Sequence, residues 1–257
     1  MRIDVELTKK NFASSRTRAR ELIEAGYVTV NGVPVLKPSQ DVDESCVIEV
    51  LGELRYVSRG GYKLETALEH FPVNISGKVC MDIGASTGGF TDCLLQNGAA
   101  KIYAVDIGER QLHDSLLSDN RVVSLENTDI RNLSDIRDRI DFCVIDVSFI
   151  SIKLIIPHIF KFLADDAVTA VLIKPQFEAG NIFGKKYFKN GIIKDGKLIA
   201  EIVSDIEAFL TNSGYELLGS SVPSKITGKD GNQEYVCCFK KAAALRTTNA
   251  DTDNSKP

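Results

Sequence analysis

The strongest constraint on the fold is a series of short apolar segments that alternate with helical patterns from residue 79 to residue 239. We expect strands at residues 79–83, 101–105, 122–125, 142–146 and 167–173, followed by a hairpin-like pair at 215–219 and 234–239. The first five segments are continuously apolar, which is typical of strands buried on both faces of a parallel sheet. With helices on both faces, the pattern predicts an α/β, Rossmann-like fold with a mostly parallel seven-stranded sheet.

The N-terminal residues form a separate pattern, typical of a small α+β module. Ser15 is a candidate N-cap for a helix that ends before Gly26. A short strand at 27–30 runs into Asn31-Gly32, the strongest two-residue signal for a hairpin. We therefore expect four parts: a module at 1–57, a linker at 58–62, a second domain at 63–241 and a disordered tail at 242–257.

Positive charge is concentrated in the N-terminal module, although the chain as a whole has a net charge of −4. Between residues 8 and 20 there is no acidic residue, and the basic residues are Lys9, Lys10, Arg16, Arg18 and Arg20. A local basic face can bind phosphates even on an acidic chain. The run of charge by itself fits nucleic-acid binding and a solvated helix face equally well.

Cysteine usage argues against a disulfide framework and against a zinc site. The six cysteines form no Cys-x-x-Cys pair, and most lie in apolar segments, as buried thiols of a reducing cytosol do. The three histidines are widely spaced, so a metal-centred mechanism has little support. No apolar segment reaches the ~18–20 residues that span a bilayer, and the first residues lack an apolar signal region. We expect a cytoplasmic protein with no integral membrane association and no metal.

The sharpest motif is a glycine-rich turn after the strand at 79–83. Its candidate cofactor-binding residues are Asp82, Gly84, Ala85, Ser86, Thr87, Gly88, Gly89 and Phe90. Ligands of parallel sheets bind at the carboxyl ends of the strands, where glycines let a cofactor approach the backbone. Asp106 ends the next strand and can accept hydrogen bonds from ribose hydroxyls. The combination predicts an adenosine-containing cofactor; a tight turn of an unrelated α/β protein is the alternative.

The turn also discriminates between cofactors. Ser86 stands where the Gly-x-Gly-x-x-Gly pattern has its middle glycine. This difference argues against a cofactor with a pyrophosphate group and therefore against an NAD-dependent oxidoreductase. S-adenosylmethionine has no phosphate and needs a close turn, a ribose acid and an adenine contact. Asp129, after the strand at 122–125, is a candidate for the adenine amino group and, equally, for a helix N-cap.

Ionisable residues end two buried strands on the cofactor side of the sheet, Asp146 in one and Lys174 in the other. An ion at such a position is costly unless it is paired. The two residues predict either a structural ion pair or, together with Lys63 and Glu234, a catalytic Lys-Asp-Lys-Glu set. Taken alone, Lys63 is typical of a solvated helix and Glu234 of an edge strand.

The chain resembles the TlyA family, also named hemolysin A, which joins an alpha-L RNA-binding module to an FtsJ-like methyltransferase domain. The matching segments are 15–19 continuing to 30–32, 58–64, 82–90, 146–151, 174–178 and 232–235, within a resemblance that covers about residues 1–241. The resemblance implies S-adenosylmethionine-dependent 2′-O-methylation of cytidine in ribosomal RNA, with ribosomal RNA and ribosomal subunits or assembly particles as partners. It also implies that Lys63, Asp146, Lys174 and Glu234 are the catalytic set.

A ribose 2′-hydroxyl is a poor nucleophile, so such an enzyme must align it with the methyl group and help remove its proton. We expect Lys174 to take the proton, Asp146 to orient Lys174 and the hydroxyl, and Glu234 to hold Lys63 or the ribose. The five basic residues of the N-terminal module would contact RNA phosphates.

Two other functions compete with methyl transfer. A membrane-active hemolysin lacks support, because the sequence has no spanning helix, secretion signal or long amphipathic basic helix. A non-catalytic ribosomal RNA-binding assembly factor is disfavoured by the intact four-residue set.

Overall fold

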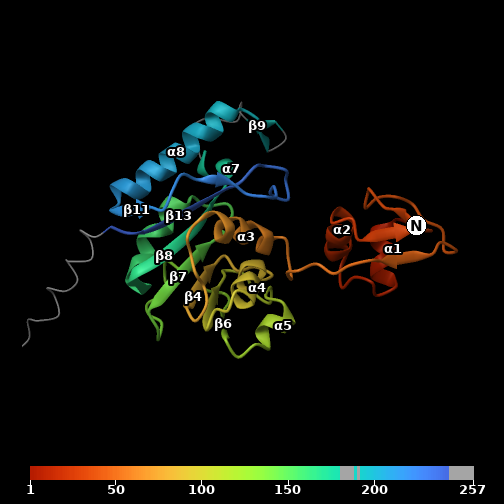
Figure 1. The fold of residues 1–257 in the computed structure, drawn as a ribbon, viewed down its shortest axis with the longest axis horizontal. Helices are drawn as coiled ribbons and strands as arrows, with labels where there is room; N and C mark the ends of the chain where they lie inside the picture. Colours follow the sequence, from red (N-terminus) through yellow and green to blue (C-terminus); the bar gives the residue numbers. More distant parts are fainter. Residues whose placement is uncertain (180–187, 190–191, 243–257) are drawn as a thin grey trace, which may run out of the picture. The chain divides into compact units, whose positions relative to one another are not determined.

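The computed structural model describes residues 1–179, 188–189 and 192–242 and divides into two compact units, Met1–Arg59 and the chain from Gly60 onward (Figure 1). All but the first residue of the expected tail at 242–257 lies outside the described residues. The expected linker at 58–62 is wrong in its second half, since Gly60 and Gly61 open helix α3 (Gly60–His70).

The N-terminal unit packs two helices against a small antiparallel sheet. Its elements are α1 (Ile3–Lys9), α2 (Arg16–Glu24), β1 (Val28–Val30), β2 (Val33–Pro34) and β3 (Ile48–Val50), with strand order β2-β1-β3. Ser15 caps α2 as predicted, because its side chain accepts a hydrogen bond from the Arg18 backbone N at 3.2 Å. Asn31 and Gly32 both have positive φ, at 49° and 76°, as the predicted hairpin requires. Helix α1 was not predicted.

The second unit is built on one twisted sheet with strand order β11-β13-β8-β7-β4-β5-β6. The strands are β4 (Val79–Ile83), β5 (Lys101–Val105), β6 (Val122–Leu125), β7 (Ile140–Ile145), β8 (Leu163–Ile173), β11 (Tyr215–Leu217) and β13 (Tyr235–Lys241). The five strands from β8 to β6 are parallel, while β13 runs antiparallel to β8 and to β11. The predicted seven strands are therefore confirmed, and the two-residue β12 (Val222–Pro223) adds an eighth beside β13.

Helices cover both faces of this sheet. On one face, α8 (Gly196–Asn212) packs with α6 (Ile156–Ile159) on a cluster that includes Ile173. The adjacent residue Leu172 points to the opposite face, where it lines a cavity with residues of α3 and α4 (Gly89–Gln96). The remaining short elements are α5 (Asp114–Leu117), α7 (Pro175–Glu178), the 3-10 turns at Ile152–Leu154 and Phe160–Phe162, and the strand pair β9 (Phe188–Lys189) and β10 (Ile192–Ile193).

The topology brings several sequence-distant residues to one edge of the sheet. Asp146 and Lys174 directly follow the parallel strands β7 and β8. Because β13 is antiparallel to β8, with Tyr235 opposite Ile173, Glu234 enters β13 at that same edge. No helix in the described part of the chain has both the length and the apolar character needed to cross a membrane.

Candidate active site

The four residues of the predicted catalytic set lie together at the carboxyl edge of the sheet. Lys174 Nζ is 2.5 Å from Asp146 Oδ1, and Lys63 Nζ is 2.6 Å from Glu234 Oε2. A longer contact of 3.9 Å joins Lys63 Nζ to Asp146 Oδ2, so the Asp146 carboxylate lies between the two ammonium groups. Lys63 comes from the first turns of α3, and the other three residues come from the ends of β7, β8 and β13. The set forms a chain of alternating charges with no net charge.

The four side chains are largely removed from solvent. Their exposed fractions are 12% for Lys63, 17% for Asp146, 8% for Lys174 and 3% for Glu234. Burial raises the pKa of Glu234, although the Lys63 ammonium group opposes this shift. Charged groups at such depth interact more strongly than in water. The ion pair with its carboxylate therefore fixes the orientation of each lysine side chain.

Ser148 and Phe149 extend the site beyond Asp146. Lys174 Nζ donates a hydrogen bond to Ser148 Oγ at 2.9 Å, so this amine has a hydroxyl partner as well as a carboxylate. Phe149 is 90% exposed and has a φ of 66°, which is unusual for a bulky residue. Its ring centroid lies 4.9 Å from that of Phe177. An exposed aromatic surface therefore lies in the same loop as the Asp146 carboxylate.

The glycine turn lies directly against this site. Gly84 has a φ of 84°, and a Cβ added there would lie 2.5 Å from the main-chain oxygen of Asp146. Asp106 is bound to the turn, because its Oδ2 accepts a hydrogen bond from the Ser86 backbone N at 2.7 Å. Its other oxygen accepts one from the Gly108 backbone N, also at 2.7 Å. The predicted ribose acid and the predicted turn are thus one hydrogen-bonded unit.

Family comparison decides which class of protein carries this arrangement. An FtsJ-like methyltransferase model matches residues 56–241, and an S4 domain model matches residues 1–48. The chain belongs to the FtsJ-like methyltransferase family.

Individual relatives agree with this assignment over most of their length. YqxC of Bacillus subtilis (strain 168) is 44% identical over 239 residues, 91% of this chain and 84% of that protein. The Mycobacterium tuberculosis (strain ATCC 25618 / H37Rv) protein named 16S/23S rRNA (cytidine-2'-O)-methyltransferase TlyA is 40% identical, covering 91% of this chain and 87% of the relative. A solved structure described as a candidate hemolysin from Streptococcus thermophilus has a TM-score of 0.73 and 35% identity, covering 100% of this chain and 98% of its own. The predicted resemblance to the TlyA family is confirmed.

Within the FtsJ-like methyltransferase domain, the predicted cofactor residues fall into two groups. Ser86 is exposed, and Gly84, Thr87, Asp106 and Asp129 are partly so. The buried group comprises Asp82, Ala85, Gly88, Gly89 and Phe90. A buried residue of the turn acts on a ligand through the backbone or through packing. At Gly88, for example, a φ of 96° favours glycine, and a Cβ would lie 2.1 Å from Leu116 Cδ1, which would have to move.

Asp82 has a structural partner inside the domain. Its side chain is fully buried, and Oδ2 accepts a hydrogen bond from Thr91 Oγ1 at 2.7 Å. Burial raises the pKa of this carboxyl to about 7, against the lowering effect of Thr91. The bond joins the end of β4 to α4 on either side of the glycine turn. Asp82 is therefore placed to support the turn from beneath.

Asp129, the predicted adenine contact, is paired with Arg131, whose Nη2 lies 2.6 Å from Asp129 Oδ2. The alternative N-cap role is wrong, since no helix begins near Asp129 among the described residues. Ile107, which sequence reasoning missed, is 75% exposed immediately after Asp106. An apolar residue directly after the predicted ribose acid is the signal by which the sequence could have added Ile107 to the candidate residues.

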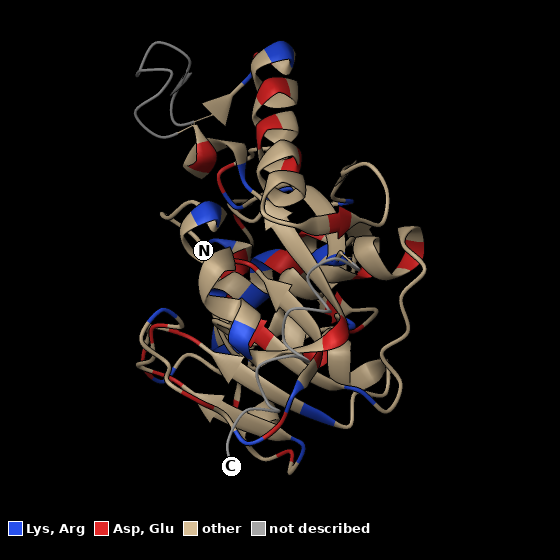
Figure 2. Cartoon of the chain, turned by 90° about the vertical axis from the view of Figure 1, so that its left-hand side faces the viewer, with Lys and Arg blue, Asp and Glu red and all other residues tan. Residues whose placement is uncertain are grey.

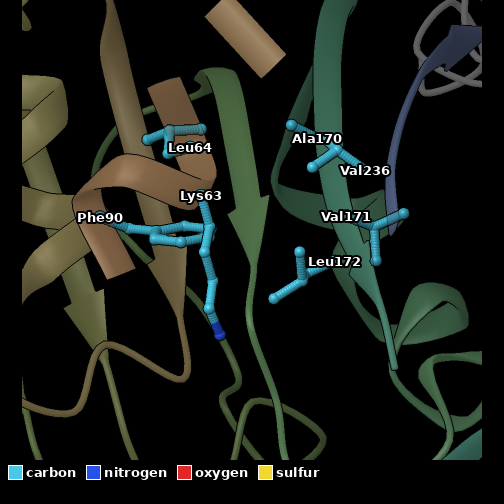
Figure 3. A pocket seen from close by; sticks show the side chains of 7 residues that line it. All are labelled: Lys63, Leu64, Phe90, Ala170, Val171, Leu172 and Val236. Atoms are coloured by element: carbon cyan, nitrogen blue, oxygen red, sulfur yellow. The ribbon is translucent and has the colours of Figure 1, made fainter. Parts of the chain in front are cut away.

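A small cavity lies beneath Lys63 (Figure 3). It is too narrow to admit a water molecule, and its lining residues are Lys63, Leu64, Phe90, Ala170, Val171, Leu172 and Val236. Pockets for small molecules usually exceed ~300 Å³ and contain several polar groups. The cavity is therefore too small and too apolar for an adenosyl group.

In the S4 domain, the predicted RNA-binding residues have unequal surroundings. Acidic and basic residues are interspersed along the chain (Figure 2). Each of the five predicted RNA-binding residues forms an ion pair with an acidic side chain. Arg16 and Arg20 pair with the buried Asp4, whereas Lys9 and Lys10 make longer contacts with Glu44 and Glu6, at 3.9 and 3.5 Å.

Arg18 differs from the other basic residues of the S4 domain. Its Nη1 donates a hydrogen bond of 2.7 Å to the Tyr56 carbonyl, and only 24% of its side chain is exposed. This contact gives Arg18 a role inside the N-terminal unit.

Across the described chain, no group of three or more His, Cys, Asp or Glu side chains is arranged to hold a metal ion.

Proposed function

We propose that this chain transfers the methyl group of S-adenosylmethionine to the ribose 2′-hydroxyl of a cytidine in ribosomal RNA. The observation that carries the proposal is the alternating set Lys174, Asp146, Lys63 and Glu234 beside the glycine turn. The relative from Mycobacterium tuberculosis that is 40% identical has this reaction in its name. A ribosomal substrate would locate the reaction in the cytoplasm.

The residues around the turn fit an adenosyl group. Each Asp106 oxygen accepts one backbone N–H, and a carboxylate offers about four acceptor sites in all. Acceptor capacity therefore remains for two ribose hydroxyls. Ile107 offers an exposed apolar side chain for the adenine ring, and Asp129 could accept from its amino group in exchange for one of its hydrogen bonds with Arg131. When bound, S-adenosylmethionine supplies an electrophilic methyl group on a sulfonium with a neutral leaving group.

The catalytic set supplies the proton acceptor. Lys174 would take the 2′-hydroxyl proton as the oxygen–carbon bond forms and the carbon–sulfur bond breaks. Asp146 and Ser148 hold its amine in place at 2.5 and 2.9 Å. Lys174 accepts the proton as a neutral amine, so the proton of its ammonium form must pass to solvent before the transfer. Glu234 keeps Lys63 beside Asp146, which leaves a second cation near Lys174.

The acceptor nucleotide has a docking surface in the same loop. Phe149 exposes its ring beside Ser148, and Phe177 supports it from α7. Bases of single-stranded or looped RNA stack on exposed aromatic rings, which contributes ~1–3 kcal/mol per base. Such stacking would hold an unpaired nucleotide with its ribose near Lys174.

The proposal is tested by incubating the purified chain with methyl-labelled S-adenosylmethionine and isolated small and large ribosomal subunits. Label is expected in ribosomal RNA, at a cytidine whose 3′ linkage resists alkaline hydrolysis. A synthetic RNA with 2′-deoxycytidine at the mapped position should accept no label. Label on a base, or label that persists in the deoxy substrate, would overturn the assignment of the acceptor oxygen.

A further inference from the structure

Asp4 in the N-terminal unit is a buried carboxylate shared by three arginines. Its side chain has no exposed area, although it lies in the first turn of α1. Arg2 Nε lies 3.0 Å from Oδ1, and Arg2 Nη2 lies 3.1 Å from Oδ2. The same Oδ2 accepts hydrogen bonds from Arg16 Nη2 at 3.0 Å and from Arg20 Nε at 3.2 Å. One carboxylate thus joins the start of α1 to two successive turns of α2.

The arginines themselves are open to solvent. Their side chains are 42%, 51% and 49% exposed for Arg2, Arg16 and Arg20, whereas Asp4 is at 0%. A guanidinium carries five N–H donors, and the contacts with Asp4 use two of them in Arg2 and one each in Arg16 and Arg20. Donors therefore remain on every guanidinium for an external anion. Three cations on one anion also leave the cluster with an excess of two positive charges.

The Asp4 carboxylate is needed for this arrangement to exist. Arg16 and Arg20 are four residues apart on α2, where like charges repel each other. Burial raises the pKa of Asp4, but hydrogen bonds from the three arginines outweigh it and lower the pKa to about 2. The group is therefore an anion throughout the neutral range. The Asp4 carboxylate fixes the three arginine side chains before a ligand binds. Binding then costs less rotamer entropy than it would with free side chains.

We propose that Asp4 is a positioning residue that assembles Arg2, Arg16 and Arg20 into one preformed binding surface for the phosphates of the RNA backbone. This inference rests on the proposed function and identifies a residue through which the S4 domain recognises its substrate. Arginine forks bind phosphate oxygens in a fixed geometry, so a fixed set of three can contact neighbouring phosphates together. The surface adds Arg2 to the phosphate-binding residues, and Asp4 acts on RNA only through the arginines.

The proposal makes a prediction opposite in sign to simple electrostatics. Asp4→Asn removes a negative charge from a surface that binds a polyanion, so a pure charge effect would tighten RNA binding. Loss of positioning would weaken it. The matched control is Asp43→Asn, which makes the same charge change at an exposed acid of the same unit.

The experiment measures ribosomal RNA affinity of the full chain against salt concentration for the wild type, Asp4→Asn, Asp43→Asn, Arg2→Gln and the Asp4→Asn/Arg2→Gln double variant. We expect Asp43→Asn to bind as tightly as the wild type or tighter, and Asp4→Asn to bind at least ~5-fold more weakly. The salt slope should fall by ~0.7–0.9 for each RNA phosphate that the variant no longer neutralises. Arg2→Gln should also weaken binding, and the double variant should lose less than the sum of the two single effects.

Arg2→Gln leaves Asp4 paired with two arginines, so it reports on the surface even if Asp4→Asn impairs folding of the unit. Asp4→Asn binding as tightly as Asp43→Asn, or strictly additive losses in the double variant, would overturn the proposal. Binding is measured without methyl transfer. A chain that shows the Asp4 effect but labels no ribosomal RNA would refute the proposed function alone.

Discussion

The main-chain oxygen of Asp146 lies against Gly84, where an added Cβ would be only 2.5 Å away. The carboxylate of the same Asp146 lies 2.5 Å from Lys174 Nζ. One residue therefore contacts the cofactor turn through its backbone and the proposed proton acceptor through its side chain. The glycine turn and the predicted catalytic set are therefore in direct contact at one edge of the sheet.

Gly84→Ala is expected to lower both stability and S-adenosylmethionine affinity. Alanine in the left-handed region costs ~1–2 kcal/mol, and the contact with the Asp146 oxygen adds to this cost. Gly77→Ala is the matched control, because Gly77 has a φ of 74° with no atom within 4 Å of its Cβ. Denaturant unfolding and cofactor titration of both variants isolate the effect of the contact. Equal behaviour of the two variants would show that the Asp146 contact is unimportant.

Asp82 should make stability depend on pH in a defined window. Its pKa is raised by burial to about 7 in the folded chain, from an ordinary value of 3.8. A raised carboxyl pKa contributes stability that is fully present below the unfolded value and is lost as pH rises through the folded value. The free energy of unfolding should therefore fall by up to ~1.4 kcal/mol per pH unit from this group between about pH 4 and 7.

Asp82→Asn removes this titration and keeps the side-chain shape. The stability of the variant relative to the wild type should rise from pH 5 to pH 7 and then level off, as measured by denaturant unfolding at each pH. A difference that does not vary with pH over this range would contradict the assigned shift.

The basic residues of the S4 domain should separate into two classes. Arg16→Ala/Arg20→Ala should weaken ribosomal RNA binding by ~10-fold or more, with a smaller salt slope and unchanged S-adenosylmethionine affinity. Arg18→Ala should instead lower the stability of the N-terminal unit, because it loses the 2.7 Å bond to the Tyr56 carbonyl. RNA titrations and thermal unfolding of the three proteins test this division. A salt-dependent loss of RNA affinity in folded Arg18→Ala would restore Arg18 to the binding surface.

Glu234→Gln should slow methyl transfer by ~10–100-fold at unchanged cofactor affinity, because Lys63 loses its close anionic partner. Glu216→Gln provides the control, as Glu216 is paired with Lys240 at 3.3 Å in an exposed part of the same sheet. Single-turnover rates at saturating RNA distinguish the two variants. A Glu234→Gln rate equal to that of Glu216→Gln would remove Glu234 from the catalytic set.

The structure confirms much of the predicted fold and brings the four predicted catalytic residues together, for a physical reason. Residues that follow parallel strands meet at one edge of a sheet, so Asp146 and Lys174 could be placed together from the strand pattern alone. Placing Glu234 at the same edge requires the direction of β13. That direction is set by pairing with the neighbouring strands and cannot be obtained from the local sequence pattern. The start of β8 was missed because Asp165 and Asp166 interrupt its apolar pattern on an exposed stretch.

The N-terminal unit was harder to predict because its key contacts are non-local. Asp4 meets Arg16 and Arg20 from 12 and 16 positions away, and no spacing rule for side chains covers that distance. Arg18 belongs to the same basic run as Arg16, yet helix geometry turns it toward Tyr56 instead. Charge counting treats these residues as equivalent, and only the packing of α1 on α2 distinguishes them.

The most direct test of the account is the single-turnover rate of methyl transfer to ribosomal RNA by Lys174→Met, which keeps the length of the side chain and removes its amine. Lys197→Met, at an exposed position of α8, is the control. We predict that Lys174→Met binds S-adenosylmethionine and RNA as the wild type does but transfers the methyl group ~10²-fold more slowly or worse. Wild-type single-turnover rates in a Lys174→Met protein with normal binding would contradict the central claim.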